Sequence, residues 1–264
     1  MVDICDKFFQ YHGIKISTDP DVSKTKTKVI MFGVKYVDPT AIMLGTDRLP
    51  YVHQWKHLGH TLCFDESSSH DLMEKKRELI GKLHSLRQEL GHQDPVVLLR
   101  LIRTYILHLY GCTMWDIFSV DAVQLWTTWH RIVKSAYELP LPTHRYLLND
   151  LVNGDHLKKM IIKRFVKFSL NIDSSKNPHV AVLHKYQSKD WRSTYGRNCM
   201  NICREAGVTN ISKVDMHNIK VNPVPPGEEW RVGLLKDILS ERDVGVGFLT
   251  KEDIDIIIKS VCCD

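Results

Sequence analysis

The sequence predicts an α+β fold that is mainly α-helical, with a small β-sheet at the N-terminus followed by a helical bundle. Three observations lead to this prediction. The first quarter of the chain contains short β-branched and apolar runs typical of strands. From Ser69 onward, apolar residues recur at the spacing of a helix face. Hydrophobic residues make up 43% and charged residues 25% of the 264 residues, which is typical of a globular protein.

The N-terminal part is predicted to contain one short helix and several short strands. Residues 4–12 carry aromatic and apolar side chains among polar ones, and Gly13 follows where a helix would end. Residues 24–32, with the sequence KTKTKVIMF, indicate a strand whose second half is buried. Two further short strands are expected near residues 41–44 and 51–55.

Two helices are predicted next. Residues 71–90 place their leucines mostly on one face and their basic side chains largely elsewhere. Asp94 followed by Pro95 indicates a helix N-cap with proline at the first helical position. The helix that follows, residues 96–109, is apolar nearly all round, so we expect it at the centre of the bundle.

A third helix is expected to begin at Asp121, as its cap, and to be stopped by Pro140 and Pro142. Three tryptophans lie in or before it: Trp115, Trp126 and Trp129. Such rings can stack on bases, but their helical spacing beside aliphatic residues favours a place in the core.

The rest of the chain is predicted to be helical with one linker. Residues 156–170 form a basic helix, and residues 173–178 mark a boundary. Residues 221–227 (VNPVPPG) indicate a linker before two closing helices at 229–240 and 250–261. Residues 184–218 fit no single element. The predicted divisions are residues 1–65, 66–140, 141–177 and 178–264.

Charge and cysteine content predict a soluble intracellular protein, nuclear or cytoplasmic. The net charge is +5, which is compatible with a polyanionic partner without requiring one. Seven cysteines are too few for a disulfide scaffold of this size, so we expect reduced thiols. No secretory start and no apolar run of roughly 18 residues is present, so no membrane partner is expected.

Two groups of residues could suggest zinc, and both are set aside. The first is His53, His57, His60 and Cys63. In a hairpin, strand alternation is expected to send His57 and His60 to opposite faces. Cys199 and Cys203 have no second Cys/His pair at zinc-finger spacing. We therefore expect no metal and no cofactor for this chain.

Two basic helix faces could contact nucleic-acid phosphates or could be ordinary solvated faces. In residues 75–87, acidic side chains lie among the basic ones and favour local pairing. The other helix has no acidic residue from 156 to 170, which favours a nucleic-acid contact. Its basic residues are Lys158, Lys159, Lys163, Arg164 and Lys167.

The order of several short motifs resembles the second half of a non-LTR (LINE-type) retrotransposon reverse transcriptase. Ser17–Pro20 (STDP) and Lys26-Thr27-Lys28, ending at Phe32-Gly33, look like a late palm motif. His57-Leu58-Gly59-His60 is similar to the family's primer-grip hairpin. Leu109-Tyr110-Gly111 with Trp115 resembles the landmark after the thumb helices. The match covers the late palm motifs, the thumb and a downstream region.

The resemblance implies a template–primer-holding region, with RNA and DNA as partners. Residues 1–65 would be a residual palm, 66–140 a helical thumb, 141–177 a basic connection, and 178–264 a helical end. Lys26 and Lys28 would help with charge on the incoming nucleotide, or are simply exposed edge-strand lysines. His57, Leu58 and Gly59 would approach the primer, or form an ordinary turn.

The resemblance also implies that this chain alone does not polymerise DNA. The family holds Mg²⁺ with palm aspartates, including an Asp-Asp pair that would lie upstream of Met1, and no such pair occurs in this sequence. We therefore expect a non-catalytic fragment of an RNA-directed DNA polymerase. The alternatives are a host-adopted nucleic-acid-binding or protein-interaction domain, and a pseudogene product without function.

Overall fold

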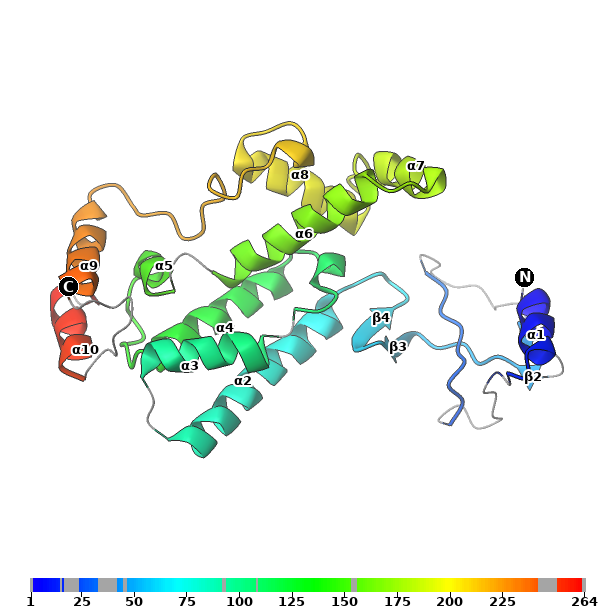
Figure 1. Ribbon diagram of the computed structural model, residues 1–264, viewed down its shortest axis with the longest axis horizontal. Coiled ribbons are helices and arrows are strands. Elements are labelled where there is room, and N and C mark those ends of the chain that lie inside the picture. Colours follow the sequence, from blue (N-terminus) through cyan, green and yellow to red (C-terminus); the bar gives the residue numbers. More distant parts are fainter. Residues whose placement is uncertain are drawn as a thin grey trace. The chain divides into compact units, whose positions relative to one another are not determined.

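The computed structural model divides the chain into two compact units, Met1–Asp71 and Leu72–Asp264 (Figure 1). It describes residues 2–14, 16, 24–32, 42–44, 47–91, 94–107, 109–152, 156–241 and 251–262. Short antiparallel strands occur in the first unit and helices dominate the second, so the predicted α+β, mainly α class is confirmed. The predicted boundary at residue 65 falls close to the division between the units.

The described residues of the first unit form helix α1, two two-stranded sheets and the first residues of α2 (Ser69–Leu90). Helix α1 spans Val2–Tyr11, and Gly13 follows it at φ +68°, as the sequence predicted for a helix end. The first sheet pairs β1 (Met43–Leu44) with β2 (Asp47–Arg48), and the second pairs β3 (Gln54–His57) with β4 (His60–Cys63).

The strand predicted over residues 24–32 is wrong. Among the described residues, this segment makes one isolated parallel bridge, between Val29 and Tyr51. In this bridge the Val29 amide donates to the Pro50 carbonyl at 3.0 Å. The Val52 amide donates to the Val29 carbonyl, also at 3.0 Å. Proline has no N–H to offer, so Pro50 interrupts the ladder on the neighbouring segment. The palm-like residues 17–20 lie outside the described residues.

Among the described residues of the second unit, the regular elements are all helices, joined by loops and turns. Its long elements are α2 (Ser69–Leu90, beginning just before the unit boundary), α3 (Pro95–Leu101), α4 (Val120–Ala136), α6 (Leu157–Asp173), α7 (Pro178–Gln187), α8 (Thr194–Ala206), α9 (Glu229–Glu241) and α10 (Lys251–Ile257). Shorter turns are η1 (Ile102–Ile106), η2 (Cys112–Met114), η3 (Arg145–Leu147), α5 (Leu148–Leu151), η4 (Ile211–Lys213) and η5 (Ile258–Cys262). The ambiguous residues 184–218 thus contain the end of α7, all of α8 and η4.

Helix starts in this unit follow local capping chemistry. The Asp94 carboxylate accepts hydrogen bonds from the Val96 and Val97 amides, so the predicted cap of α3 is confirmed. The prediction that Asp121 caps the next helix is wrong. Ser119 is the N-cap of α4, and its hydroxyl accepts from the Ala122 amide at 3.2 Å. Asp121 lies one residue inside, where its charge still favours the positive end of the helix.

One core takes buried residues from α4 and from the segment 96–109, which was predicted as its central helix. That segment is α3 followed by the π-helical turn η1, and Tyr105 within it is 64% exposed. The fully buried side chains of greatest volume are Trp115, Trp129 and Phe165, from the segment before α4, from α4 itself and from α6. The prediction that the three tryptophans belong to the core is confirmed, since Trp126 is also buried.

Candidate nucleic-acid interface

Helix α6 carries the basic residues that the sequence predicts as a phosphate-contacting face. Its N-cap is His156, whose Nδ1 accepts a hydrogen bond from the Lys158 amide at 3.1 Å. One face of the helix is buried in the core and includes Leu157, Ile161 and Phe165. Because the apolar face is buried, the basic side chains are divided between the edges of that face and the opposite side.

Two of the five basic residues are engaged within the protein. The Lys158 ammonium is 2.6 Å from the Glu205 carboxylate of α8 and lies over the Phe118 ring. The Arg164 guanidinium donates from Nη1 to the Leu109 carbonyl at 2.9 Å. Lys158 and Arg164 therefore connect α6 to neighbouring segments. Their side chains already have partners within the protein, so they are less available to an external phosphate.

The other three basic residues form a line along one side of α6, which we name the α6 lysine stripe: Lys159, Lys163 and Lys167. Their four-residue spacing places them on one face of the helix. Lys163 and Lys167 are exposed and Lys159 is half-buried. Within the described ranges, none of the three forms an ion pair or a side-chain hydrogen bond. The stripe is thus a row of uncompensated positive charge.

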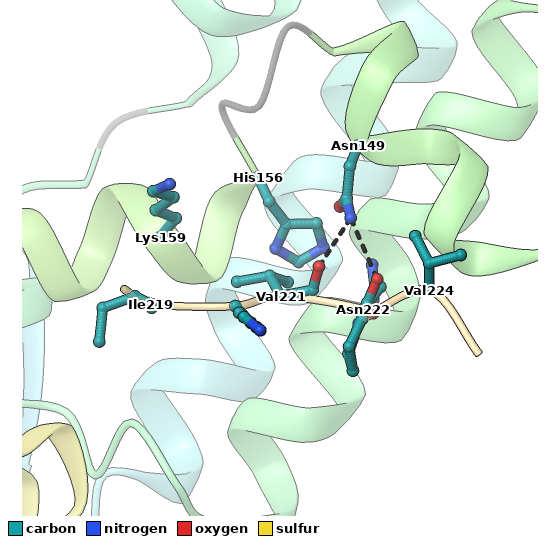
Figure 2. A pocket seen from close by; sticks show the side chains of 9 residues that line it. Asn149, His156, Lys159, Ile219, Val221, Asn222 and Val224 are labelled. Atoms are coloured by element: carbon teal, nitrogen blue, oxygen red, sulfur yellow. Dashed lines mark hydrogen bonds between the residues drawn. The ribbon is translucent and has the colours of Figure 1, made fainter. Parts of the chain in front are cut away.

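A cavity of about 420 Å³ opens at the N-terminal end of the stripe (Figure 2). Lys159 of the stripe lines it together with His156, and Lys220 contributes a second ammonium group. The remaining lining comes from Asn149 and from the segment that passes beneath the start of α6. Among the described residues that line this cavity there is no carboxylate, so its charge is positive.

Residues 221–227, predicted as a linker, form no helix or strand, and the start of this segment is hydrogen-bonded to the helices. The Asn149 side-chain amide donates to the carbonyls of Val221 and Asn222, at 2.7 and 3.2 Å (Figure 2). The Asn222 side chain in turn donates to the Arg145 carbonyl at 3.3 Å. Asn222 has φ +49°, a backbone conformation that asparagine tolerates better than most residues. A proline-rich composition alone did not show that these asparagines hold the segment in place.

A pair of buried histidines supports the start of α6. The Nε2 atoms of His130 and His156 are 2.7 Å apart, and the side-chain amide of Asn222 lies 3.1 Å from His130 Nε2. His156 Nδ1 accepts the Lys158 amide, so the neutral ring carries its proton on Nε2 and donates it to His130. His130 then carries its proton on Nδ1. Sequence patterns did not indicate this pair, because its members are 26 residues apart.

Both imidazoles are held neutral. Burial lowers the pKa of His130 to about 4, with a further contribution from the charges of Arg145 and Lys134. Burial, then the neighbouring His130 and Lys158, lowers the pKa of His156 to about 3. A neutral His156 can accept the Lys158 amide as an N-cap, whereas a protonated ring could not. The positive charge of this region therefore comes from lysine, not from histidine.

The other predicted contact residues lie in the first unit. Leu58 and Gly59 form the turn between β3 and β4, with φ values of +48° and +83°. Positive φ at both positions is typical of the tight type I′ hairpin turn. The exposed tip consists of His57, Leu58 and Gly59, so the predicted hairpin is confirmed as a structure.

The prediction that His57 and His60 point to opposite faces is wrong. The two-residue turn pairs them directly across the hairpin, which places their side chains on one face. His57 is exposed, but His60 is buried and its Nδ1 lies 3.0 Å from the Asp71 carboxylate. The Asp71 carboxylate also accepts from the Thr61 amide at 3.3 Å. This contact secures the hairpin within the first unit.

The two predicted palm lysines differ in their surroundings. Lys26 is exposed. The Lys28 ammonium lies 3.5 Å from the centroid of the Trp55 ring, on β3, in a cation–π contact. Lys28 therefore joins its segment to the hairpin, and the described contacts do not gather it with Lys26 into one patch.

Over the described ranges, no three His, Cys, Asp or Glu side chains gather as a metal site. No helix there is both long enough and apolar enough to cross a membrane. Comparisons with protein-family models, curated proteins and solved structures find no match to this chain. The candidate interface is therefore argued from its own geometry and charge.

Proposed function

We propose that this chain holds nucleic acid without catalysing a reaction, and that the α6 lysine stripe is its main contact. In this proposal the chain is the thumb and downstream part of a non-LTR-type reverse transcriptase, and its ligand is a template–primer duplex of RNA and DNA. It would act where such duplexes form, in the nucleus or the cytoplasm.

The observation that carries the proposal is the absence of partners for Lys159, Lys163 and Lys167 in the described protein. Four residues of α-helix rise about 6 Å, so the three ammonium groups repeat at a spacing that suits consecutive backbone phosphates. Lysine is suited to such contacts, because it neutralises phosphate without requiring a base sequence. An amphipathic helix whose lysines served only as a solvated face would more often pair them with nearby carboxylates.

The cavity at the start of α6 supports the same reading. Lys159 and Lys220 line it without a carboxylate among its described residues, so the positive region continues past the end of the helix. The segment that carries Lys220 is fixed by the Asn149 hydrogen bonds. A fixed cation costs less conformational entropy on binding than a mobile one.

The first unit contributes less to the proposal. The exposed Leu58–Gly59 turn could approach a primer backbone, since a glycine lets a phosphate come close. The metal-binding aspartates of a polymerase would have to come from residues outside this chain, since the sequence has no Asp-Asp pair. Accordingly, Mg²⁺ would belong to the intact parent enzyme.

Binding of a fluorescent RNA–DNA hybrid to the full chain tests the proposal. The triple variant Lys159→Gln, Lys163→Gln, Lys167→Gln removes the stripe while keeping helix-forming side chains. We expect its Kd, measured by fluorescence anisotropy at fixed salt, to rise at least tenfold. Three lost phosphate contacts are expected to matter this much because each releases counterions on binding.

The matched control is the triple variant Lys75→Gln, Lys76→Gln, Lys82→Gln on α2. It removes the same net charge, but Lys75 and Lys82 already pair with Glu78 and Lys76 donates to Gln124. We expect less than a threefold change for this control. Equal losses in the two triple variants would mean that only overall charge matters, and the stripe would not be the site.

Ligand preference separates a template–primer holder from a host-adopted nucleic-acid-binding domain. A polymerase thumb should bind the RNA–DNA hybrid more tightly than either free strand of the same length. Equal affinity for hybrid, single-stranded RNA and single-stranded DNA, still lost in the stripe variant, would instead favour the host-adopted domain.

A further inference from the structure

A second cavity, of about 820 Å³, lies among the end of α6, α7, α8 and the residues just after α8. Its volume is in the range of pockets that hold cofactor-sized ligands, and it is far larger than a phosphate ion needs. Within α8, Gly196 approaches the carbonyls that end α7, and an added Cβ would lie 2.2 Å from the Asp190 oxygen. The helices that form the cavity are therefore packed closely at one end.

Three basic side chains line this cavity: Lys185, Lys189 and Arg204. All three are exposed. Among the described residues none of them forms an ion pair. Asp173 is the one carboxylate in the described lining, and it faces His184, with 3.4 Å between its Oδ1 and the histidine Nδ1. The free charge at this cavity is thus positive, and it favours an anionic ligand.

His184 adds a specific hydrogen-bonding requirement. Its side chain lines the cavity and is only 7% exposed. Its Nε2 has no hydrogen-bond partner within the described residues. A buried ring nitrogen without a partner is costly, and a polar group of a ligand would satisfy it.

The remaining lining is partly polar, with Ser188, Thr209 and Asn210, and partly apolar. Met200, Val208 and Ile211 supply soft, flat surfaces suited to a ring. Two thiols, Cys199 and Cys203, also line the cavity, but burial raises the pKa of both, to about 11 for Cys199. They therefore remain protonated near neutral pH and are poor nucleophiles.

We propose that this cavity binds a nucleoside monophosphate, with the phosphate held by Lys189 and Arg204 and a polar edge of the base hydrogen-bonded to His184 Nε2. The ring would lie against Met200 and Ile211. This site is distinct from the α6 lysine stripe and does not depend on it. A phosphate alone would satisfy the cations but would leave both the histidine and the apolar wall without a partner.

A free mononucleotide and the phosphorylated end of a strand carry the same chemistry. Two probes separate these sources: UMP and AMP as free ligands, and a 5′-phosphorylated tetranucleotide as a strand end. Inorganic phosphate is the third probe, since it presents the charge without a ring. Titration of each probe into the full chain by calorimetry gives the Kd values.

The test variant is Lys189→Gln, Arg204→Gln, which changes exposed residues and should leave the fold intact. Its control is Lys176→Gln, Lys213→Gln, two exposed residues outside the cavity lining with the same change in net charge. We expect the test variant to weaken nucleotide binding at least tenfold and the control to change it less than twofold. The α6 triple variant should bind mononucleotide normally, so failure of one site is distinguishable from failure of the other.

Side-chain ¹⁵N NMR of His184 gives a second readout, because its Nε2 resonance should shift when the ring forms a hydrogen bond with the base of the ligand. Saturable binding of UMP or AMP with this shift supports a free-nucleotide site. Binding of the tetranucleotide alone, with the same shift, supports a strand-end site. If neither binds, or if inorganic phosphate binds as tightly as the nucleotides, the proposal is wrong.

Discussion

Helices α2 and α6 are both basic and amphipathic, yet their charges are arranged in opposite ways. On α2, Lys75 and Lys82 pair with Glu78 of the same helix, and Lys76 donates to Gln124. On α6, Lys159, Lys163 and Lys167 have no partner in the described protein. The number of basic residues is thus a poor guide to a polyanion site. What distinguishes the two helices is whether a carboxylate or amide oxygen lies within reach of their lysine side chains.

Helix α6 also begins in an unusual way. Its N-cap is a buried imidazole that must remain neutral, and His156 shares a hydrogen bond with His130. In the unfolded chain these side chains take up protons as the pH falls through about 6.5. In the folded chain they do so only near pH 4 and pH 3, respectively. The contribution of these two histidines to folding stability is therefore complete above about pH 7 and is lost as the pH falls from about 6.5 to 4.

The largest expected effect is this acid loss of stability. Each pKa unit is worth about 1.4 kcal/mol, so the His130 shift alone implies a loss of roughly 3 kcal/mol across the window. Urea unfolding at a series of pH values measures it. The variant His156→Asn keeps an acceptor at the N-cap and removes one titrating group, so its stability should depend less steeply on pH. Equal pH dependence in variant and parent would contradict the assigned buried pair.

A smaller effect is expected from the space around two helical glycines, one in α2 and one in α8. Gly196 of α8 lies against the Asp190 and Gln187 carbonyls, whereas Gly81 of α2 has nothing within 4 Å of an added Cβ. We expect Gly196→Ala to cost about 2 kcal/mol through overpacking. Gly81→Ala should stabilise the protein by about 1 kcal/mol, because alanine favours helix. Thermal unfolding of both variants would show shifts of opposite sign, and a shift of the same sign would refute the close approach at Gly196.

The smallest effect is expected from a variant in which the lysines of α2, like those of the α6 lysine stripe, lack a partner. The variant Glu78→Gln releases Lys75 and Lys82 from their shared partner. If uncompensated lysines create the interface, hybrid affinity should rise roughly twofold to fivefold, with little loss of stability because surface ion pairs contribute about 0.5 kcal/mol. An unchanged Kd would mean that position on the molecule, and not lack of pairing, selects α6.

Sequence patterns predicted features that depend on near neighbours. The Asp94 cap, the Gly13 helix end and the Leu58–Gly59 turn are each set by two or three adjacent residues. The start of α4 was misassigned because Ser119 and Asp121 are both good caps, and the competition between them depends on where the preceding turn leaves the chain. The strand at residues 24–32 failed because its partner segment contains Pro50.

The candidate site was only partly predictable for the same reason. Local sequence identified the five basic residues of α6, but it did not show that Lys158 meets Glu205, 47 residues away, or that Arg164 meets the Leu109 carbonyl. Such long-range partners decide which cations remain available. The buried pair of His130 and His156 was invisible for the same cause, because helix packing brings the two rings together.

The salt dependence of hybrid binding tests the central claim most directly. The slope of log K against log salt concentration reports how many phosphates the protein neutralises, at about 0.9 per contact on duplex DNA. The triple variant of Lys159, Lys163 and Lys167 should flatten this slope by roughly 2 to 3 units, while the α2 triple variant keeps the parent slope. Parallel slopes for the parent and the α6 variant would contradict the assignment of phosphate contacts to α6.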